Sequence, residues 1–313
     1  MPPNPVVEIR IPTYRRPAGL RRTIKSLQNQ EEENWRALIF DGSPDEEANG
    51  VIEAINDPRL AFHGTTEPVS EVINTERAYT SDSLTGAKYA IVVRDYSSFP
   101  ADYLSTFIVH AKKDEVDLLL APTFYLPENT DEEFLNSEIF EHWFKPKIYS
   151  PIEFHAHLFF DKGVGVGNIF WCTESRLPLQ VSKVKHAGLA ELCRTLQINT
   201  PLRYLAQTYA VTTQAPGDEP TDNTPAFTDP YARGRQSVTR YLIRKYDDSI
   251  IEKAREIADE KNLHTELESI LIDSGSYPRK PYTLPTSRRL FLAFRSTFKF
   301  RWVNDPLLEY FRS

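Results

Sequence analysis

The stretch VVEIRIPTYRRPAGLRRTIKSLQ, residues 6–28, contains a strand, a turn and a helix in direct succession. Its first six residues are mostly β-branched and lie between two prolines, which is typical of a short buried strand. After the turn at TYRRP, Leu20, Ile24 and Leu27 recur at helical spacing with basic residues on the opposite side. The stretch therefore predicts one strand–turn–helix unit.

The same order of elements recurs along the following residues. Strands are predicted at residues 35–40, 60–63 and 88–93, and helices at residues 46–55 and 71–84. Strands and helices that alternate at this spacing predict an α/β fold of the Rossmann-like kind. Its sheet is expected to be mostly parallel and covered by helices on both faces.

The second half of the chain has a less regular pattern. Its predicted elements are a helix from about residue 101, a strand over 116–126, two strands around a glycine loop within 157–172, a helix over 187–196 and helical structure over 236–272. Residues 215–230 are rich in Pro, Asp and Thr, which is typical of a linker. We expect an α/β domain over residues 1–215, followed by a linker and helical C-terminal extension over residues 216–313.

The composition excludes several classes of protein. The chain has 313 residues, of which 40% are hydrophobic and 26% charged, so a wholly disordered chain is excluded. A formal charge of −7 argues against nucleic acid as a partner. Two cysteines are too few for a disulfide framework, and neither a secretory leader nor a long apolar run is present in the sequence. We expect a cytoplasmic protein.

Three polar residues directly follow predicted strands, namely Thr13, Asp41 and Asp95. The carboxyl ends of parallel strands lie at one edge of a sheet, where the loops leave a crevice that binds ligands. We therefore expect these three side chains to converge on a binding site.

The segments around these residues resemble those of the family 2 glycosyltransferases. Residues 6–30 are similar to the family's opening strand, PTYNR turn and first helix. Residues 38–63 (LIFDGSPDEEANGVIEAINDPRLAFH) are similar to its VDDGSPD turn, second helix and NDPR segment, and residues 88–104 (KYAIVVRDYSSFPADYL) to the strand and loop that hold its DxD motif. The resemblance covers about residues 6–105 and implies a GT-A fold and a nucleotide-diphosphate sugar as donor.

The resemblance also implies a set of binding residues. The expected nucleotide-sugar-binding residues are Thr13, Tyr14, Arg16, Asp41, Arg77, Arg94 and Asp95. Thr13 and Asp41 are expected against the nucleobase and ribose, and Arg77 near the nucleotide. Structural roles are open beside these: Asp41 as a turn residue, Thr13 as a helix cap and Arg77 as a surface residue paired with a neighbouring acid.

The sequence departs from the family at the DxD motif, where Asp95 is the one acid that remains in VRDYS. Mg²⁺ or Mn²⁺ held weakly through Asp95 and the diphosphate is one interpretation. Arg94 in place of the metal is a second, because arginine matches phosphate geometry. The third is that Arg94 and Asp95 pair with each other and activity has been lost.

The family's catalytic ED dipeptide is also absent from the corresponding segment, KVKHAGLAELCRTL at residues 183–196. An inverting transferase needs a base that takes the proton of the acceptor hydroxyl. His186 and Glu191 are the candidates here, and Asp161 is a third. For His186 the structural alternative is a surface or capping histidine. The sequence GVGVG at residues 163–167 lacks the dinucleotide-binding spacing and predicts a loop near the acceptor or a hairpin turn.

The resemblance implies a glycosyltransferase, with inversion of the anomeric carbon, that acts in surface polysaccharide or glycoconjugate assembly. Its acceptor would be a saccharide or a lipid-linked saccharide. The alternative is a catalytically inactive GT-A-like scaffold or sugar-binding subunit. A nucleotidyltransferase would carry a glycine-rich loop after its first strand, which IPTYRRP lacks. The basic and aromatic tail, residues 287–313, suits peripheral contact with the inner face of a membrane, an oligomer interface or docking on the chain's own domain.

Overall fold

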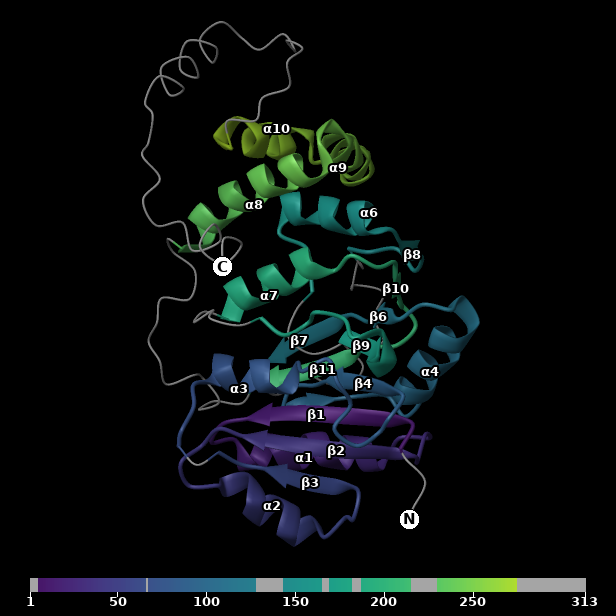
Figure 1. Cartoon of the computed structure of the whole chain (residues 1–313), viewed down its shortest axis with the longest axis vertical. Coiled ribbons are helices and arrows are strands. Elements are labelled where there is room, and N and C mark those ends of the chain that lie inside the picture. The colour runs from purple at the N-terminus through teal and green to yellow at the C-terminus, as the bar shows by residue number, and fades with distance from the viewer. Residues whose placement is uncertain are drawn as a thin grey trace, which may run out of the picture. The chain divides into compact units, whose positions relative to one another are not determined.

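The computed structural model describes residues 5–65, 67–127, 143–164, 169–181, 187–214 and 230–274 (Figure 1). The chain divides into two compact units. The first comprises Met1–Pro151 and Val164–Asn223, and the second comprises Ile152–Gly163 and Thr224–Ser313. The segment Ile152–Gly163 thus belongs with the C-terminal helices and not with the sheet that precedes it. The predicted boundary near residue 215 falls among residues 215–229, outside the described part of the chain.

The first unit is built on a large sheet with the strand order β3-β2-β1-β4-β9-β6-β10-β8. These strands are β1 (Val7–Thr13), β2 (Trp35–Asp41), β3 (Leu60–His63), β4 (Tyr89–Val92), β6 (Leu118–Leu120), β8 (Ile148–Tyr149), β9 (Ile169–Cys172) and β10 (Leu202–Tyr204). The strands from β3 to β4 are parallel, whereas β9 runs antiparallel to both of its neighbours. The predicted fold class, a mostly parallel sheet flanked by helices, is confirmed.

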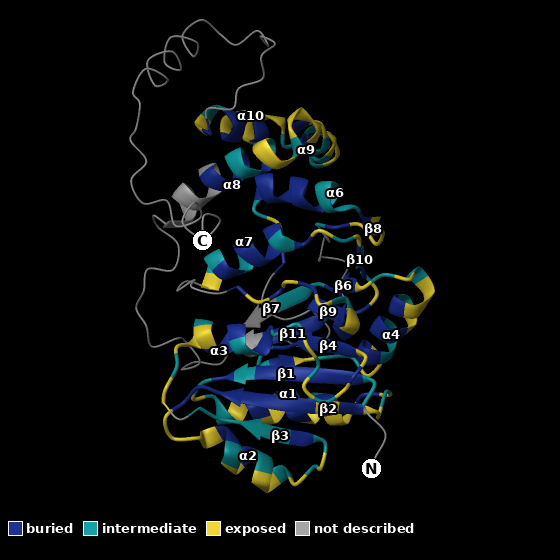
Figure 2. Ribbon diagram, viewed as in Figure 1, coloured by how far each residue is buried: buried dark blue, intermediate teal, exposed yellow. Residues whose placement is uncertain are grey.

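Helices and a smaller sheet complete this unit. The helices are α1 (Pro17–Gln28), α2 (Glu47–Ile55), α3 (Glu71–Ala78), α4 (Tyr103–Asp114) and α7 (Ala187–Gln197), with a short 3₁₀ helix, η2 (Thr173–Ser175). The smaller sheet has the order β5 (Ser97–Ser98), β11 (Ala210–Gln214) and β7 (Thr123–Pro127). Figure 2 shows the strands of the large sheet mostly buried, with exposed residues on the outer sides of α2 and α4.

The alternation of β1 explains how one strand serves both faces of the sheet. Val7, Ile9 and Ile11 belong to the apolar core into which α1 packs its buried side. The residues between them are charged, yet Glu8 and Arg10 are also fully buried. Because side chains alternate along a strand, this pair faces the opposite side of the sheet.

Glu8 and Arg10 bind each other and the loop that follows α3. Arg10 Nε donates to Glu8 Oε1 at 2.6 Å, and its other nitrogens donate to the carbonyls of residues 78, 80 and 82. Glu8 Oε2 accepts the backbone N–H groups of Leu84 and Thr85 at 2.8 and 2.7 Å. Burial lowers the pKa of the Arg10 guanidinium, and the Glu8 carboxylate opposes that shift.

This network corrects the predicted length of the third helix. The helix was expected over residues 71–84, but α3 ends at Ala78. The carbonyl of Ala78, which in a continued helix would accept the N–H of residue 82, accepts from Arg10 instead. A buried arginine therefore ends the helix and draws the following loop onto β1.

Two strand predictions beyond residue 110 were also wrong. The strand expected over residues 116–126 is split into β6 and β7, and the two halves join different sheets around Pro122. Proline has no N–H to donate to a strand neighbour, so it favours such a break. The first of the two strands expected within 157–172 is the 3₁₀ helix η1 (His157–Phe160). Asp161 ends it in a left-handed conformation, with φ of 57°.

The second unit is helical in its described residues. It contains η1, most of α6 (Pro151–Ala156), and then α8 (Pro230–Tyr246), α9 (Asp248–Lys261) and α10 (His264–Asp273). The helical structure expected over 236–272 is present, but it is broken where Asp247 and Asn262 take positive φ values. His155 Nδ1 lies 2.8 Å from the hydroxyl of Tyr246 and links α6 to α8.

Two features predicted from sequence lie outside the described residues. These are the central residues of the glycine loop, 165–168, and the basic tail, residues 287–313. Among the described residues, no helix has the length and apolar composition needed to cross a lipid bilayer.

Substitution of Glu8 by Ala should lower the free energy of unfolding by about 3–5 kcal/mol, because it leaves Arg10 buried without its carboxylate. The N–H groups of Leu84 and Thr85 would lose their acceptor at the same time. Urea-induced unfolding of the purified variant measures the loss. Arg36→Ala is the matched control, because Arg36 is an exposed residue of the neighbouring strand β2. A loss below about 1 kcal/mol for Glu8→Ala would contradict the assigned role.

Candidate functional site

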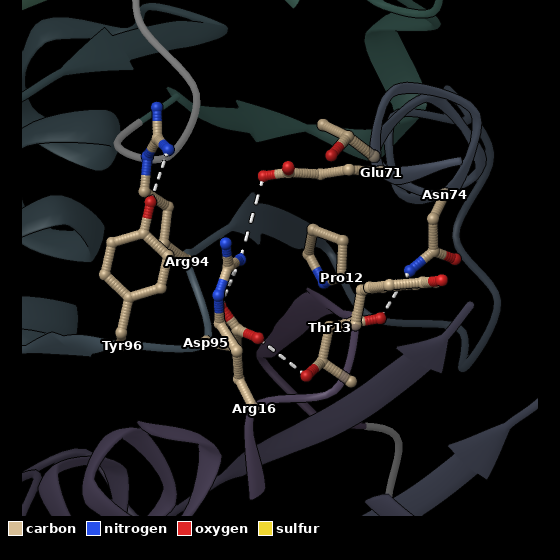
Figure 3. A pocket seen from close by; sticks show the side chains of 10 residues that line it. Pro12, Thr13, Arg16, Glu71, Asn74, Arg94, Asp95 and Tyr96 are labelled. Carbon is tan, nitrogen blue, oxygen red and sulfur yellow. Dashed lines mark hydrogen bonds and ion pairs between the residues drawn. The ribbon is translucent and has the colours of Figure 1, made fainter. Parts of the chain in front are cut away.

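The carboxyl ends of β1, β2 and β4 meet at one edge of the large sheet. Thr13 and Asp41 end β1 and β2 and are register partners, and Asp95 follows β4. Thr13 Oγ1 donates a hydrogen bond of 2.6 Å to Asp95 Oδ2. A pocket opens at this edge (Figure 3). Its lining residues are Pro12, Thr13, Tyr14, Arg16, Glu71, Asn74, Thr75, Arg94, Asp95 and Tyr96.

Asp95 lies at the base of the pocket and is 2% exposed. Burial raises its pKa to about 6, although Arg16 and the Thr13 hydroxyl favour the ionised form. Arg16 Nη1 lies 3.7 Å from Asp95 Oδ1 and 3.8 Å from Glu71 Oε1, so its guanidinium stands between two carboxylates (Figure 3). Thr13 is the last residue of β1 and Arg16 holds the N-cap position of α1, so the alternative role of Thr13 as a helix cap is wrong.

Helix α1 fixes the loop that carries Asp95. The hydroxyl of Thr23 accepts from the N–H of Ser97 at 3.0 Å and donates to its carbonyl at 2.8 Å. A Cβ added at Gly19 would lie 2.9 Å from the carbonyl oxygen of Asp95, closer than side-chain carbons approach. Glycine at position 19 therefore permits the close approach of α1 to the loop.

A second guanidinium also lies near Tyr96. Arg94 Nη1 donates to the Tyr96 hydroxyl at 2.7 Å, and Arg94 Nη2 lies 3.6 Å from Glu191 Oε1 of α7. The guanidinium carbons of Arg16 and Arg94 lie 5.1 and 5.8 Å from the centroid of the Tyr96 ring. Two cationic groups therefore lie near one aromatic ring in a pocket at the ends of parallel strands, an arrangement suited to an anion.

Asp41 is engaged by its own turn and is not among the residues that line the pocket. Its Oδ1 accepts from the N–H and the hydroxyl of Ser43 at 2.9 and 2.6 Å, and its Oδ2 accepts from the N–H of Ala48 at 3.1 Å. The structural role left open for Asp41 is therefore present. Its expected contact with a nucleotide stays a prediction.

Asn74 of α3 joins the ends of β1 and β2 and was missed from the sequence. Its Nδ2 donates to the carbonyls of Thr13 and Phe40 at 3.0 and 2.6 Å. Its Oδ1 accepts from Arg77 Nη1 at 3.0 Å, while Arg77 Nη2 donates to the carbonyl of Gly64 at 3.1 Å. Burial lowers the pKa of Arg77. Arg77 is thus held beside the end of β2, and its nucleotide contact stays a prediction.

Helix α7 is anchored by a buried ion pair between Arg194 and Glu76 of α3. Arg194 Nε donates to the carbonyl of Leu179 at 2.9 Å, and its guanidinium carbon lies 3.7 Å from the centroid of the Tyr79 ring. Glu76 Oε2 accepts from the N–H of Val181 at 2.6 Å. Burial raises the pKa of Glu76, which Arg194 opposes. Glu191, one turn before Arg194, is thereby placed within reach of Arg94.

The candidate bases fall in different parts of the chain. Glu191 lies on α7 with 27% of its side chain exposed. His186 lies outside the described residues and stays a prediction. Asp161 belongs to the second unit, where it ends η1.

The side chains at the pocket do not form a cage for a divalent cation. Within the described residues, no cluster of three or more His, Cys, Asp or Glu side chains could hold a metal ion. Asp95 and Glu71 supply two carboxylates, but both lie beside Arg16, and the second oxygen of Asp95 accepts from Thr13. Mg²⁺ and Mn²⁺ prefer several oxygen ligands, whereas two guanidiniums share this pocket. Metal held through Asp95 stays a prediction that this donor set does not favour.

Part of the chain is similar in sequence to a curated glycosyltransferase. No family model matches the chain. A putative colanic acid biosynthesis glycosyl transferase, WcaA of Escherichia coli K12, is 26% identical over 113 residues, which are 35% of this chain. The match covers 39% of the length of that relative.

Solved structures are similar over most of the chain. S. aureus TarS 1-349, in complex with UDP-GlcNAc, superposes with a TM-score of 0.52 and 12% identity over 87% of this chain and 81% of that one. GalNAc-T7 with UDP, GalNAc and Mn²⁺ gives 0.50 and 9% identity over 87% of this chain and 55% of that one. The predicted GT-A fold and the predicted resemblance to glycosyltransferases are therefore confirmed.

The buried position of Asp95 predicts a pH-dependent stability. Because burial raises the pKa of Asp95 to about 6 in the folded state, protonation stabilises the fold at low pH, and this stabilisation is lost as the pH rises through 6. The free energy of unfolding of the wild type, relative to Asp95→Asn, should fall by about 1 kcal/mol between pH 5 and pH 7.5. Urea unfolding at the two pH values measures this difference.

The exposed residue Asp102 supplies the control for this measurement. The Asp102→Asn variant should follow the wild type at both pH values. A constant difference between the wild type and Asp95→Asn over the same range would contradict the assigned environment of Asp95.

Proposed function

We propose that the chain is a glycosyltransferase that takes its sugar from a nucleotide-diphosphate donor. The observation that carries the proposal is the convergence of Thr13, Arg16, Arg94 and Asp95 in one pocket at the carboxyl edge of the sheet. Ligands of open α/β sheets bind at this edge. The likeness to a TarS structure in complex with UDP-GlcNAc makes a UDP-sugar the first donor to test.

The two arginines would bind the donor diphosphate. Arginine presents parallel N–H groups that match phosphate oxygens, and its charge persists in a partly buried site. Arg16 and Arg94 have side chains that are 11% and 19% exposed, so the field they create is weakly screened by water. Their positive charge would stabilise the negative charge that develops on the departing nucleotide, without a metal ion held by the protein.

The proposed reaction is a single displacement with inversion. The acceptor oxygen forms a bond to the anomeric carbon while the bond from that carbon to the diphosphate oxygen breaks. The electron pair leaves with the nucleotide diphosphate, and the proton of the acceptor hydroxyl passes to the base. Glu191 is the described candidate for this base, and His186 is the other.

A cell-surface polysaccharide or glycoconjugate is the proposed product. The support is the relative WcaA, whose name refers to colanic acid biosynthesis. A saccharide or lipid-linked acceptor suits that context. Membrane contact through residues 287–313 is a further part of the proposal, which the described residues leave untested.

The alternative function is a sugar-binding or scaffold subunit without turnover. The observation in its favour is that Asp95 faces Thr13 and Arg16, so this acid is already engaged by neighbouring side chains. A scaffold of this kind would retain the fold and the arginine pair without a working base. Nucleotide binding and turnover separate the two functions.

Isothermal titration with UDP, GDP and TDP should show binding of at least one nucleotide in EDTA, with an affinity that Mn²⁺ changes less than threefold. Arg16→Met and Arg94→Met should each weaken that binding about tenfold, since each removes a cation from the diphosphate. Arg21→Met is the matched control, because Arg21 lies on the exposed side of α1. Strict dependence on Mn²⁺ would contradict the role of the arginines, and failure of every nucleotide to bind would favour the scaffold.

A further inference from the structure

Arg94 lies between the proposed donor pocket and helix α7, which carries the candidate base Glu191. It follows β4 and lines the pocket, and its Nη2 lies 3.6 Å from Glu191 Oε1 on α7. The two side chains are 19% and 27% exposed. The pair is therefore partly shielded from water but remains accessible to a ligand that enters the pocket.

The geometry of this ion pair leaves room for a stronger partner. Charge-assisted hydrogen bonds between a guanidinium and an oxyanion are about 2.7–2.9 Å long, whereas this contact is 3.6 Å. Arg94 Nη1 is fixed by its hydrogen bond to the Tyr96 hydroxyl. The Nη2 contact with Glu191 is thus longer than the Nη1 hydrogen bond to Tyr96, and it is the contact for which a diphosphate would compete.

Helix α7 is held in place independently of this contact. Arg194 is fully buried and binds Glu76 and the carbonyl of Leu179. The hydroxyl of Thr195 accepts from the N–H of Val164 at 3.0 Å and donates to the carbonyl of Glu191 at 2.9 Å. Release of the Glu191 carboxylate would therefore move its side chain and leave the backbone of α7 where it is.

We propose that Arg94 holds Glu191 in the donor-free protein and that the donor diphosphate takes over Arg94, which releases Glu191 from this ion pair so that its carboxylate can accept a proton. This inference rests on the proposed function. It makes the base available when the donor is bound, so donor binding precedes activation of the acceptor hydroxyl. Glu191 and the diphosphate compete for the Arg94 guanidinium, so the presence of the Glu191 carboxylate lowers the affinity of the protein for the donor.

Glu191→Gln should increase affinity for UDP and for inorganic pyrophosphate about fivefold, because a neutral amide competes weakly for Arg94. Isothermal titration in EDTA measures both ligands, and circular dichroism checks the fold of each variant. Glu33→Gln is the matched control, since it removes one negative charge from an exposed residue. Its affinities should stay within twofold of the wild type.

A double-mutant cycle separates direct competition from a general effect of charge. In the Arg94→Met background, Glu191→Gln should give no further gain in affinity, because the shared guanidinium is absent. An unchanged affinity of Glu191→Gln, or a gain of the same size with and without Arg94, would overturn the inference while the donor site itself stands. Failure of the wild type to bind UDP and the other nucleotides would instead reject the proposed function along with it.

Discussion

The hydrogen bond between Thr13 and Asp95 is the interaction on which the site depends. A carboxylate buried at the end of a strand is costly unless neighbours compensate it, and Thr13 and Arg16 supply that compensation from the end of β1 and the start of α1. The same strand, turn and helix therefore both build the sheet and hold the acid. Thr23 and Gly19 extend this arrangement, because they allow α1 to approach the loop after β4.

The charges at the pocket give the site a character different from that of a metal-bridged transferase. Two acids, Glu71 and Asp95, and two guanidiniums gather there, and both guanidiniums lie near the Tyr96 ring. Positive charge is supplied by side chains whose positions are fixed by protein contacts. The carboxylates Glu71 and Glu191 balance these cations in the free protein, so binding of an anion exchanges partners among charges that are already present.

The sequence predicted the elements that depend on the pattern of neighbouring residues along the chain. The alternation in residues 6–28 identified β1 and α1, and the polar residues after strands identified Thr13 and Asp95 as neighbours. Asn74 and Tyr96 were missed because their roles depend on partners far along the chain or across the sheet edge. The same reason explains the early end of α3, which a buried arginine from β1 determines. The strand expected from residue 157 is instead η1, which ends at the left-handed Asp161.

The buried pair in β1 has a consequence for the order of assembly. Burial of Glu8 and Arg10 away from water is costly in free energy unless the backbone of residues 78–85 is in place to form hydrogen bonds with them. An early intermediate that paired β1 with β2 alone would leave two charges inside an apolar surface. We therefore expect β1 to reach its final packing only when a segment some seventy residues downstream is in place. Contacts between segments so far apart in the sequence favour slow folding and cooperative unfolding.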